Sequence, residues 1–388
     1  MTSKERHEAR YQRRRAKREA RRAAVNAKCT FEQVFSFTNL YQSYRKCCLG
    51  VGWKSSTQLY RANAMLNVAK TYTALRDGTF RSKGFNEFDI HERGKPRHIR
   101  AVHISERVVQ RCLCDHALVP LLERSFIYDN GASTKDKGIT FALDRLETHL
   151  RKFWRTYGTD GYVLTFDVHH YFDSIPHDHI FRIIDKAIAD ERLRKLTRYF
   201  ISAFGEVGMG LGSQVSQVFA LATLNGLDHK IKEQAGIKYY GRYMDDGYLI
   251  HHDKAYLEKC RRAIIRYCRS IGLELNENKT QIRPISRGVP FLKVKFSVSE
   301  TGRVVRRASR KNTTAMRRKL KVFRRWVDDP KNRFTFEDVR TSYMSWIGHI
   351  KQSDSWRTRQ RMDLLYRDLF AKELKACTTS SKMGLKSG

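Results

Sequence analysis

The 388-residue sequence lacks the features of a membrane, secreted or zinc-binding protein. It has no run of about 18 apolar residues, and its N-terminus has no apolar core of the kind that a signal peptide needs. Its eight cysteines include no CxxC pair, and its histidines form no cluster at zinc-ligand spacing. We therefore predict a cytoplasmic protein with reduced thiols, without a membrane partner or a zinc finger.

Acidic residues are scarce relative to basic ones. The chain has 76 Lys and Arg against 40 Asp and Glu, a formal net charge of +36, and the excess is spread along the sequence. This charge favours a polyanionic partner, because each phosphate that a cation neutralises releases condensed counterions. A ribosomal-type binder or a membrane-surface protein would share it, so composition favours nucleic acid without indicating catalysis. The 41% of apolar residues is enough for a core and excludes global disorder.

The chain divides into four segments. The first is an Arg-rich arm that cannot bury a face of its own, so we expect a disordered or induced helix that binds nucleic acid through Arg13, Arg14 and Arg15. A solubilising or localisation tail is the alternative. A large body of alternating helical and strand-like patterns follows, then a basic module sized for three helices and a flexible tail. The predicted bounds are 1–30, 31–300, 301–376 and 377–388.

Several elements of the body can be placed from local patterns. FNEFDIHERGKPRHIRAVHIS has short alternating runs around a Gly-Lys-Pro turn and predicts a hairpin. Residues 106–119 have helical spacing, and we expect Pro120 to end that helix. YVLTFDV is a short apolar run typical of a buried strand, and KYYGRYMDDGYLI predicts a second hairpin.

Three carboxylates stand at the ends of these strands. Asp167 and Val168 end YVLTFDV, and Asp245 and Asp246 lie at the tip of the second hairpin. Adjacent like charges repel, so the arrangement is costly unless a cation occupies it. A solvated turn explains most isolated Asp-Asp pairs, but YMDD between two apolar strands, downstream of a strand-terminal Asp, rarely arises by chance.

Phosphoryl transfer is the chemistry that such carboxylates serve. Two Mg²⁺ ions about 4 Å apart bridge the attacking 3′ oxygen, the transferred phosphorus and the leaving pyrophosphate. One carboxylate must bridge both ions while another completes the cage. We assign Asp167 and Asp245 as this pair, with Asp246 as the weaker third ligand.

These segments resemble motifs of reverse transcriptases. FDVHHYFDSI is similar to the family's first metal-binding motif, and YMDD to its signature box. The resemblance implies an α+β right-hand polymerase fold, in which fingers and a palm with a mixed sheet precede an α-helical thumb. It also implies that Val168 joins the metal ligands and that Phe172 excludes ribonucleotides at the sugar 2′ position, with core packing as the alternative for Phe172.

Further family motifs follow in order. ERGKPRHI resembles the fingers hairpin that grips the triphosphate, LGSQVSQ the loop over the nascent base pair, LELNENKTQI the element with a Lys near the pyrophosphate, and VPFLKVKF the primer grip. The resemblance implies nucleotide contacts by Lys95, Arg97, Gly212, Ser216 and Gln217, and it implies that Lys279 is a general acid. A solvated basic turn is the alternative for Lys95 and Arg97.

Three positions depart from the family pattern. Leu211-Gly212 replaces the common Gln-Gly, which removes a polar contact near the incoming nucleotide, and Gly247 replaces a frequent aromatic residue. Ser216-Gln217 replaces the common Ser-Pro, a variant associated with diversity-generating retroelements and with unassigned or defence-associated bacterial reverse transcriptases. The nearest subgroup is thus expected within the bacterial group II-like lineage.

The resemblance implies an RNA-directed DNA polymerase that makes cDNA from a structured non-coding RNA in an antiviral defence system. Its expected cofactor is Mg²⁺, with Mn²⁺ as a substitute, and its partners are the RNA/DNA duplex, dNTPs and, as a further candidate, an accessory protein. The thumb would bind nucleic acid through Arg317, Arg318, Arg324 and Arg325, unless these form a solvated helix face.

Three other functions stay open. A diversity-generating retroelement enzyme would have low fidelity. An RNA-templated RNA polymerase or an untemplated nucleotide-adding enzyme is disfavoured by the aromatic side chain of Phe172. A non-catalytic RNA-binding scaffold on a polymerase fold belongs to another class, and it is disfavoured because all three aspartates are present.

Overall fold

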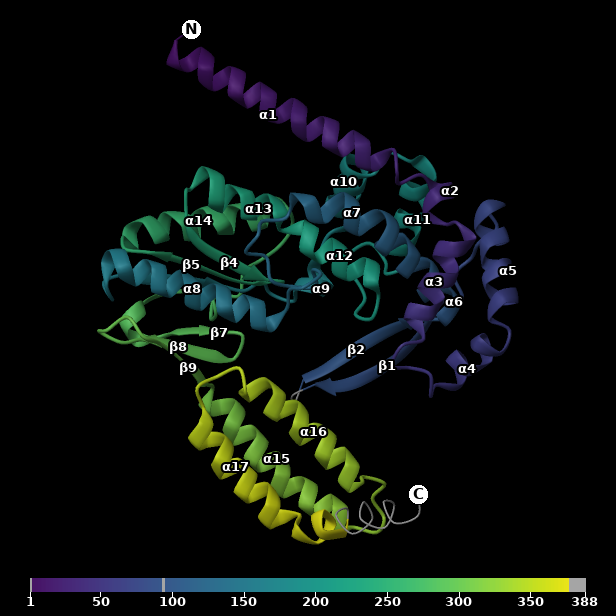
Figure 1. The fold of residues 1–388 in the computed structure, drawn as a ribbon. Helices are drawn as coiled ribbons and strands as arrows, with labels where there is room; N and C mark the ends of the chain where they lie inside the picture. Colours follow the sequence, from purple (N-terminus) through teal and green to yellow (C-terminus); the bar gives the residue numbers. More distant parts are fainter. Residues whose placement is uncertain (1, 93–94, 377–388) are drawn as a thin grey trace, which may run out of the picture.

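The computed structural model describes residues 2–92 and 95–376 (Figure 1). The N-terminal arm is a long helix, α1 (Ser3–Asn26), which projects from the body and begins with a capping box between Thr2 and Glu5. Its side chains are mostly exposed, as its composition predicts. The next helices are α2 (Phe31–Val34), α3 (Phe37–Cys47), α4 (Ser55–Ala62) and α5 (Ala64–Arg76).

The first predicted hairpin is confirmed. Strands β1 (Phe85–Glu92) and β2 (Lys95–Val102) pair antiparallel, with Glu92 opposite Lys95. Helix α6 (Ile104–Leu113) follows, and Leu211, far along the chain, makes a parallel bridge to Ile99 of β2. The hairpin is therefore joined to the segment that leads into α12.

The prediction that Pro120 ends the following helix is wrong. After α6 the chain continues through a π-helical turn (Cys114–Leu118) into α7 (Val119–Leu122) and a 3-10 turn (Glu123–Ser125). Pro120 lies in the first turn of α7. A proline is tolerated there because the missing N–H has no obligatory partner in a first turn.

The central sheet carries the remaining predicted strands. Its order is β4-β5-β3-β6 with antiparallel neighbours, and a parallel bridge joins Asn130 to Arg242 at the β4 edge. Alternation along β3 turns Val163 and Leu164 to opposite faces, toward the separate cores that contain α8 and α14. The bounds are β3 (Tyr162–Phe166), β4 (Tyr239–Tyr243), β5 (Asp246–His251), β6 (Gln281–Pro284), α8 (Ile139–Tyr157) and α14 (Lys254–Ser270).

Short helices connect the strands of this sheet. The Gly-rich segment leads into a helix as predicted, and Ser213 caps it. The connecting helices are α9 (Tyr171–Ser174), α10 (His177–Ala187), α11 (Glu191–Ser202), α12 (Gln214–Thr223) and α13 (Asn225–His229), followed by a π-helical turn (Lys230–Gln234).

A third, three-stranded sheet and a helical module complete the described chain. After a 3-10 turn (Ile285–Arg287), β7 (Val289–Phe291), β8 (Val294–Val298) and β9 (Val304–Ala308) pair in that order. The expected boundary at residue 301 thus falls inside this sheet, because β9 pairs with β8. The helices are α15 (Arg310–Asp328), α16 (Phe336–Ile350) and α17 (Trp356–Leu369), and they enclose a core of their own.

The architecture confirms the predicted α+β class and the three C-terminal helices. The expected tail, 377–388, lies outside the described residues. Within residues 2–92 and 95–376, no helix combines the length and the apolar character needed to cross a membrane.

Candidate active site

Strand pairing brings the three aspartates together. Phe166, the last residue of β3, pairs with Gly247 of β5 in an antiparallel register. The next position along each strand therefore places Asp167 opposite Asp246. Asp245 lies beside them at the β4–β5 tip, where Met244 adopts a left-handed backbone conformation with φ of 54°. The carboxylates come from segments distant in sequence and meet where β3 ends and β5 begins.

Burial and mutual repulsion disfavour the charged forms of two of these groups. Burial raises the pKa of Asp245 to about 6, and the charge of Asp167 adds to this effect. The pKa of Asp246 is also raised, first by burial and then by the neighbouring Asp245 and Asp167. The site therefore concentrates negative charge that a cation would relieve.

Lys279 supplies one such cation. Its Nζ donates a hydrogen bond to Oδ2 of Asp167 at 2.8 Å. Although burial alone would lower the pKa of Lys279, the hydrogen bond and charge of Asp167 raise it. Lys279 lies in the loop before β6. This loop is held against the end of β3 by a 2.7 Å hydrogen bond from the Asn276 N–H to the Asp167 carbonyl.

The donor set fits a divalent metal ion by its chemistry, because Mg²⁺ prefers carboxylate oxygens. Val168, whose backbone carbonyl would serve as the further ligand, is buried and bridges to Leu275. Within the described chain, no three His, Cys, Asp or Glu side chains converge as a preformed metal cage. An ion would share the Asp167 carboxylate with Lys279, since a carboxylate offers about four lone-pair positions.

Gly247 allows the tip to approach β3. A Cβ added at this glycine would lie 2.3 Å from the ring of Phe166. The aromatic residue that commonly follows the second Asp would not fit in this arrangement. This departure from the family pattern thus has a steric reason.

The other expected nucleotide-binding residues lie in α9, in α12 and in the loop before α12. Phe172 is half-buried on α9 and packs against the main core, and Ser216 is buried on α12 with an Oγ that has no hydrogen-bond partner. Gln217 is exposed. Gly212 adopts φ of +112° directly after Leu211, whose carbonyl accepts a hydrogen bond from the Arg100 N–H.

The fingers residues lie at the hairpin tip. Lys95 begins β2 and pairs with Glu92, but its side chain lies outside what the structure describes. Arg97 has an exposed side chain on the same strand, opposite Ile90. The hairpin is thus joined to the Gly212 loop through β2.

The expected nucleic-acid-binding arginines fall into two groups. Arg13, Arg14 and Arg15 are exposed on α1, and Arg317, Arg318 and Arg325 are exposed on α15. Arg324 differs, because its guanidinium binds Asp328, the Leu369 carbonyl and Glu373, the last at 2.7 Å. Arg324 thus has partners inside the helical module, which the sequence did not predict.

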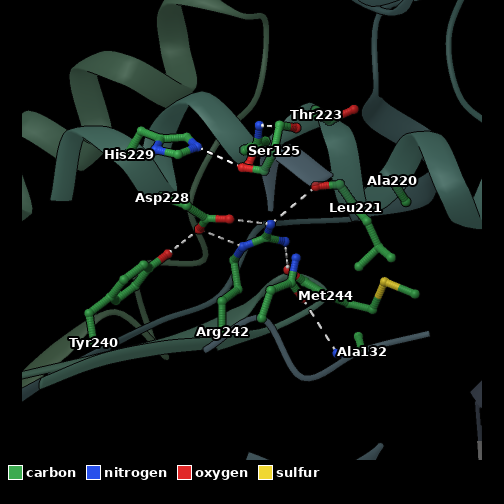
Figure 2. A network of polar contacts seen from close by, with 12 residues as sticks. Ser125, Ala132, Ala220, Leu221, Thr223, Asp228, His229, Tyr240, Arg242 and Met244 are labelled. Atoms are coloured by element: carbon green, nitrogen blue, oxygen red, sulfur yellow. Dashed lines mark hydrogen bonds and ion pairs between the residues drawn. The ribbon is translucent and has the colours of Figure 1, made fainter. Parts of the chain in front are cut away.

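A buried ion pair next to the β4–β5 tip was not predicted from the sequence. Arg242 and Asp228 are both fully buried, with Nη2 2.6 Å from Oδ2, and Tyr240 also donates to Asp228 (Figure 2). Arg242 donates further bonds to the carbonyls of Met244 and Leu221. The available signal was a charged residue inside an apolar strand, because such a group must find an opposite charge.

Family membership follows from a comparison with known families. The model of the reverse transcriptase (RNA-dependent DNA polymerase) family matches residues 86–296, more than half of the chain. The protein therefore belongs to the reverse transcriptase family and has a right-hand polymerase fold. Enzymes of this family generally use divalent metal ions.

Solved telomerase structures are among those similar to the chain. Truncated apo telomerase from Candida tropicalis is 14% identical, with TM-score 0.45 over 57% of this chain and 54% of that one. Telomerase from Candida albicans in complex with a TWJ fragment of telomeric RNA is 9% identical, with TM-score 0.46 over 74% and 61%. This chain thus spans between half and two thirds of those proteins. No curated protein matches it.

Proposed function

We propose that this polymerase copies a structured RNA into DNA at Asp167, Asp245 and Asp246. The observation that carries the proposal is the strand register, which places Asp167 opposite Asp246 with Asp245 beside them. The raised pKa of Asp245 supports it, since clustered carboxylates of this kind are costly without a cation.

Each residue has a distinct task in this proposal. Asp167, Asp245 and the Val168 carbonyl would hold two Mg²⁺ ions, or Mn²⁺ in their place, with Asp246 as the weaker ligand. The bound ions would lower the pKa of the primer 3′ hydroxyl and stabilise the charge on the leaving pyrophosphate. Lys279 stays protonated beside Asp167 and gives a proton to that pyrophosphate as general acid.

The incoming nucleotide is held from two sides. Lys95 and Arg97 on the hairpin contact the triphosphate, while Gly212, Ser216 and Gln217 lie over the nascent base pair. The unpartnered Oγ of buried Ser216 supports this, because a buried hydroxyl without a partner is costly unless a ligand completes it. Phe172 contacts the sugar and disfavours ribonucleotides.

Nucleic acid is held by charge on two separate helices. The exposed arginines of α1 and α15 contact phosphates, and the RNA/DNA duplex is recognised by its backbone shape rather than by sequence. Specificity then comes from a particular structured RNA, and an accessory protein is a further candidate partner. We place the enzyme in the cytoplasm, in keeping with free cysteines at seven described positions.

We further propose an antiviral defence role for an enzyme of the bacterial group II-like lineage. The Ser216-Gln217 pair also favours a second candidate, a low-fidelity enzyme of a diversity-generating retroelement. The two roles differ in error rate. Sequencing cDNA made on one defined RNA separates them, because diversification requires frequent misincorporation and defence does not.

Primer extension on an RNA template with Mg²⁺ tests the core of the proposal. We expect the intact protein to make labelled DNA and Asp245→Asn to lose at least about 10³-fold in rate, because a carboxamide is a weak metal ligand. Asp173→Asn is the matched control, since Asp173 lies in the same motif with a 77% exposed side chain. Full synthesis by Asp245→Asn would reject the assigned site.

A further inference from the structure

The carbonyls in the last turn of α12 accept hydrogen bonds from side chains of other elements. The final carbonyls of a helix have no partner within the helix and need donors from elsewhere. Here the Ala220 carbonyl accepts from the Tyr171 hydroxyl at 2.5 Å, and the next carbonyl, Leu221, accepts from Nη2 of Arg242 at 3.1 Å. His179 Nε2 lies 3.2 Å from the Thr223 carbonyl.

Tyr171 connects this turn to the first aspartate. It begins α9, four positions after Asp167, and its side chain is buried. Its neighbour Phe172 accepts a hydrogen bond from the Met209 N–H at 2.7 Å through its backbone carbonyl. The segment that follows Asp167 is thereby fixed to the α12 end by a buried phenol.

Arg242 connects the same turn to the other two aspartates. Figure 2 shows its guanidinium between Asp228, Leu221 and Met244. The bond to the Met244 carbonyl, 2.6 Å long, holds the residue that directly precedes Asp245. Because Met244 has a positive φ, the tip depends on such a bond to keep its backbone conformation.

We infer that Tyr171 and Arg242 are positioning residues, which set the separation of Asp167 and Asp245 by binding consecutive carbonyls of α12. The inference deepens the proposed function and rests on its assignment of the metal ligands. The two aspartate-bearing segments are anchored to one rigid helix end rather than only to each other. Repulsion between the carboxylates is thus resisted from outside the metal site.

The anchor has a further consequence for nucleotide binding. The N-terminus of α12 is fixed by Ser213, whose hydroxyl donates to Gln110 at 2.9 Å, and it follows the Gly212 loop. One helix therefore links the base-pair loop to the aspartates. Loosening its C-terminal bonds should change metal binding and kcat while the KM for dNTP, set at the other end, changes little.

Tyr171→Phe tests the inference with a single lost hydroxyl. Mn²⁺ binding measured by electron paramagnetic resonance should weaken about tenfold or more, and kcat should fall by a similar factor, as is typical when an outer partner of a metal ligand is removed. The KM for dNTP should stay within about twofold. Arg242→Lys, which keeps the charge beside Asp228, should weaken Mn²⁺ binding in the same way.

Tyr256→Phe is the matched control. Its hydroxyl donates to the Ala235 carbonyl at 2.7 Å, at the end of the π-helical turn after α13 and on another element from the aspartates. Equal Mn²⁺ affinity and kcat in Tyr171→Phe and Tyr256→Phe, with matching urea midpoints, would overturn the inference. If Tyr171→Phe loses much more stability than the control, the same Mn²⁺ titration of Arg242→Lys tests the inference in its place.

Asp167→Asn separates this inference from the proposed function. Loss of Mn²⁺ binding in Asp167→Asn, with normal binding in Tyr171→Phe and Arg242→Lys, would leave the site assignment standing and reject only the anchor. Normal Mn²⁺ binding and synthesis in Asp167→Asn would reject the site assignment itself.

Discussion

Lys279 forms an ion pair with Asp167 and lies between that carboxylate and the solvent. The two side chains meet at 2.8 Å, yet the lysine is 58% exposed and the aspartate 6% exposed. A buried carboxylate is thus neutralised by a cation that stays accessible to solvent.

Lys279→Gln should slow nucleotide addition about 10²-fold, because a positioned proton donor contributes a factor of this size. Single-turnover incorporation of one dNTP measures the rate. Lys195→Gln is the control, since Lys195 also pairs with a carboxylate, Glu191, at 2.8 Å but lies on α11. Equal rates for the two variants would contradict a role for Lys279 in the reaction.

Phe172→Ala should increase the use of ribonucleotides relative to deoxynucleotides. The ring that would exclude the 2′ hydroxyl is removed, and the ratio of the two kcat/KM values should shift about tenfold or more. Steady-state incorporation of CTP against dCTP gives this ratio. Phe172→Tyr keeps the ring and should preserve selectivity; an unchanged ratio in Phe172→Ala would indicate that the ring serves packing alone.

Gly247→Ala should destabilise the sheet and the tip together. The new methyl would collide with the Phe166 ring at 2.3 Å, and overpacking of this kind costs about 1–3 kcal/mol. Urea unfolding measures the loss. Gly348→Ala, within α16 with nothing near the added Cβ, should leave stability unchanged or raise it slightly. Equal midpoints for both variants would contradict the close approach of β3 and β5.

Acid should destabilise the protein through His149 on α8. Burial lowers the pKa of His149 to about 4, against an unfolded value of about 6.5. The unfolded state therefore binds the proton first, so the free energy of unfolding is highest above pH 6.5 and falls by about 3 kcal/mol as pH drops toward 4. Urea unfolding of His149→Gln should lack this component, and an identical pH profile for both proteins would refute it.

The charges of α15 should differ in their response to salt. Arg317→Gln with Arg318→Gln should weaken duplex binding and reduce the slope of log affinity against log salt by about 1 per lost phosphate contact. Fluorescence anisotropy at several salt concentrations gives the slope. Arg324→Gln should keep the slope and lower thermal stability instead, because it loses the ion pair with Glu373. A reduced slope in Arg324→Gln would place that residue on the duplex.

Local patterns were enough to predict the elements that carry the aspartates. A short apolar run with β-branched and aromatic content defined β3, and a polar pair between two apolar runs defined the β4–β5 hairpin. Register was not predictable, since it depends on pairing between residues far apart in sequence, such as Phe166 and Gly247. The sequence therefore predicted that the aspartates meet, but not which of them lie opposite each other.

The interactions that escaped prediction are long-range and buried. Arg242 reads as one more cation in a basic chain, and only the fold brings Asp228 against it. The Pro120 helix was missed for a local reason, because a π-turn before the proline removes the need for its N–H. The partners of Arg324 inside the helical module were not predicted, because a helix sequence does not reveal which cations turn toward their own module.

Arg306 on β9 stands where the helical module meets the rest of the protein. Its side chain binds Asp144 and Glu147 of α8, each at 2.6 Å, and its N–H binds Asp354 between α16 and α17 at 2.9 Å. Arg306 thus connects α8 to the helical module through hydrogen bonds and ion pairs. Ionic strength should then control how readily the helical module moves away from a bound duplex. It should thereby control how many nucleotides the enzyme adds before it releases the duplex.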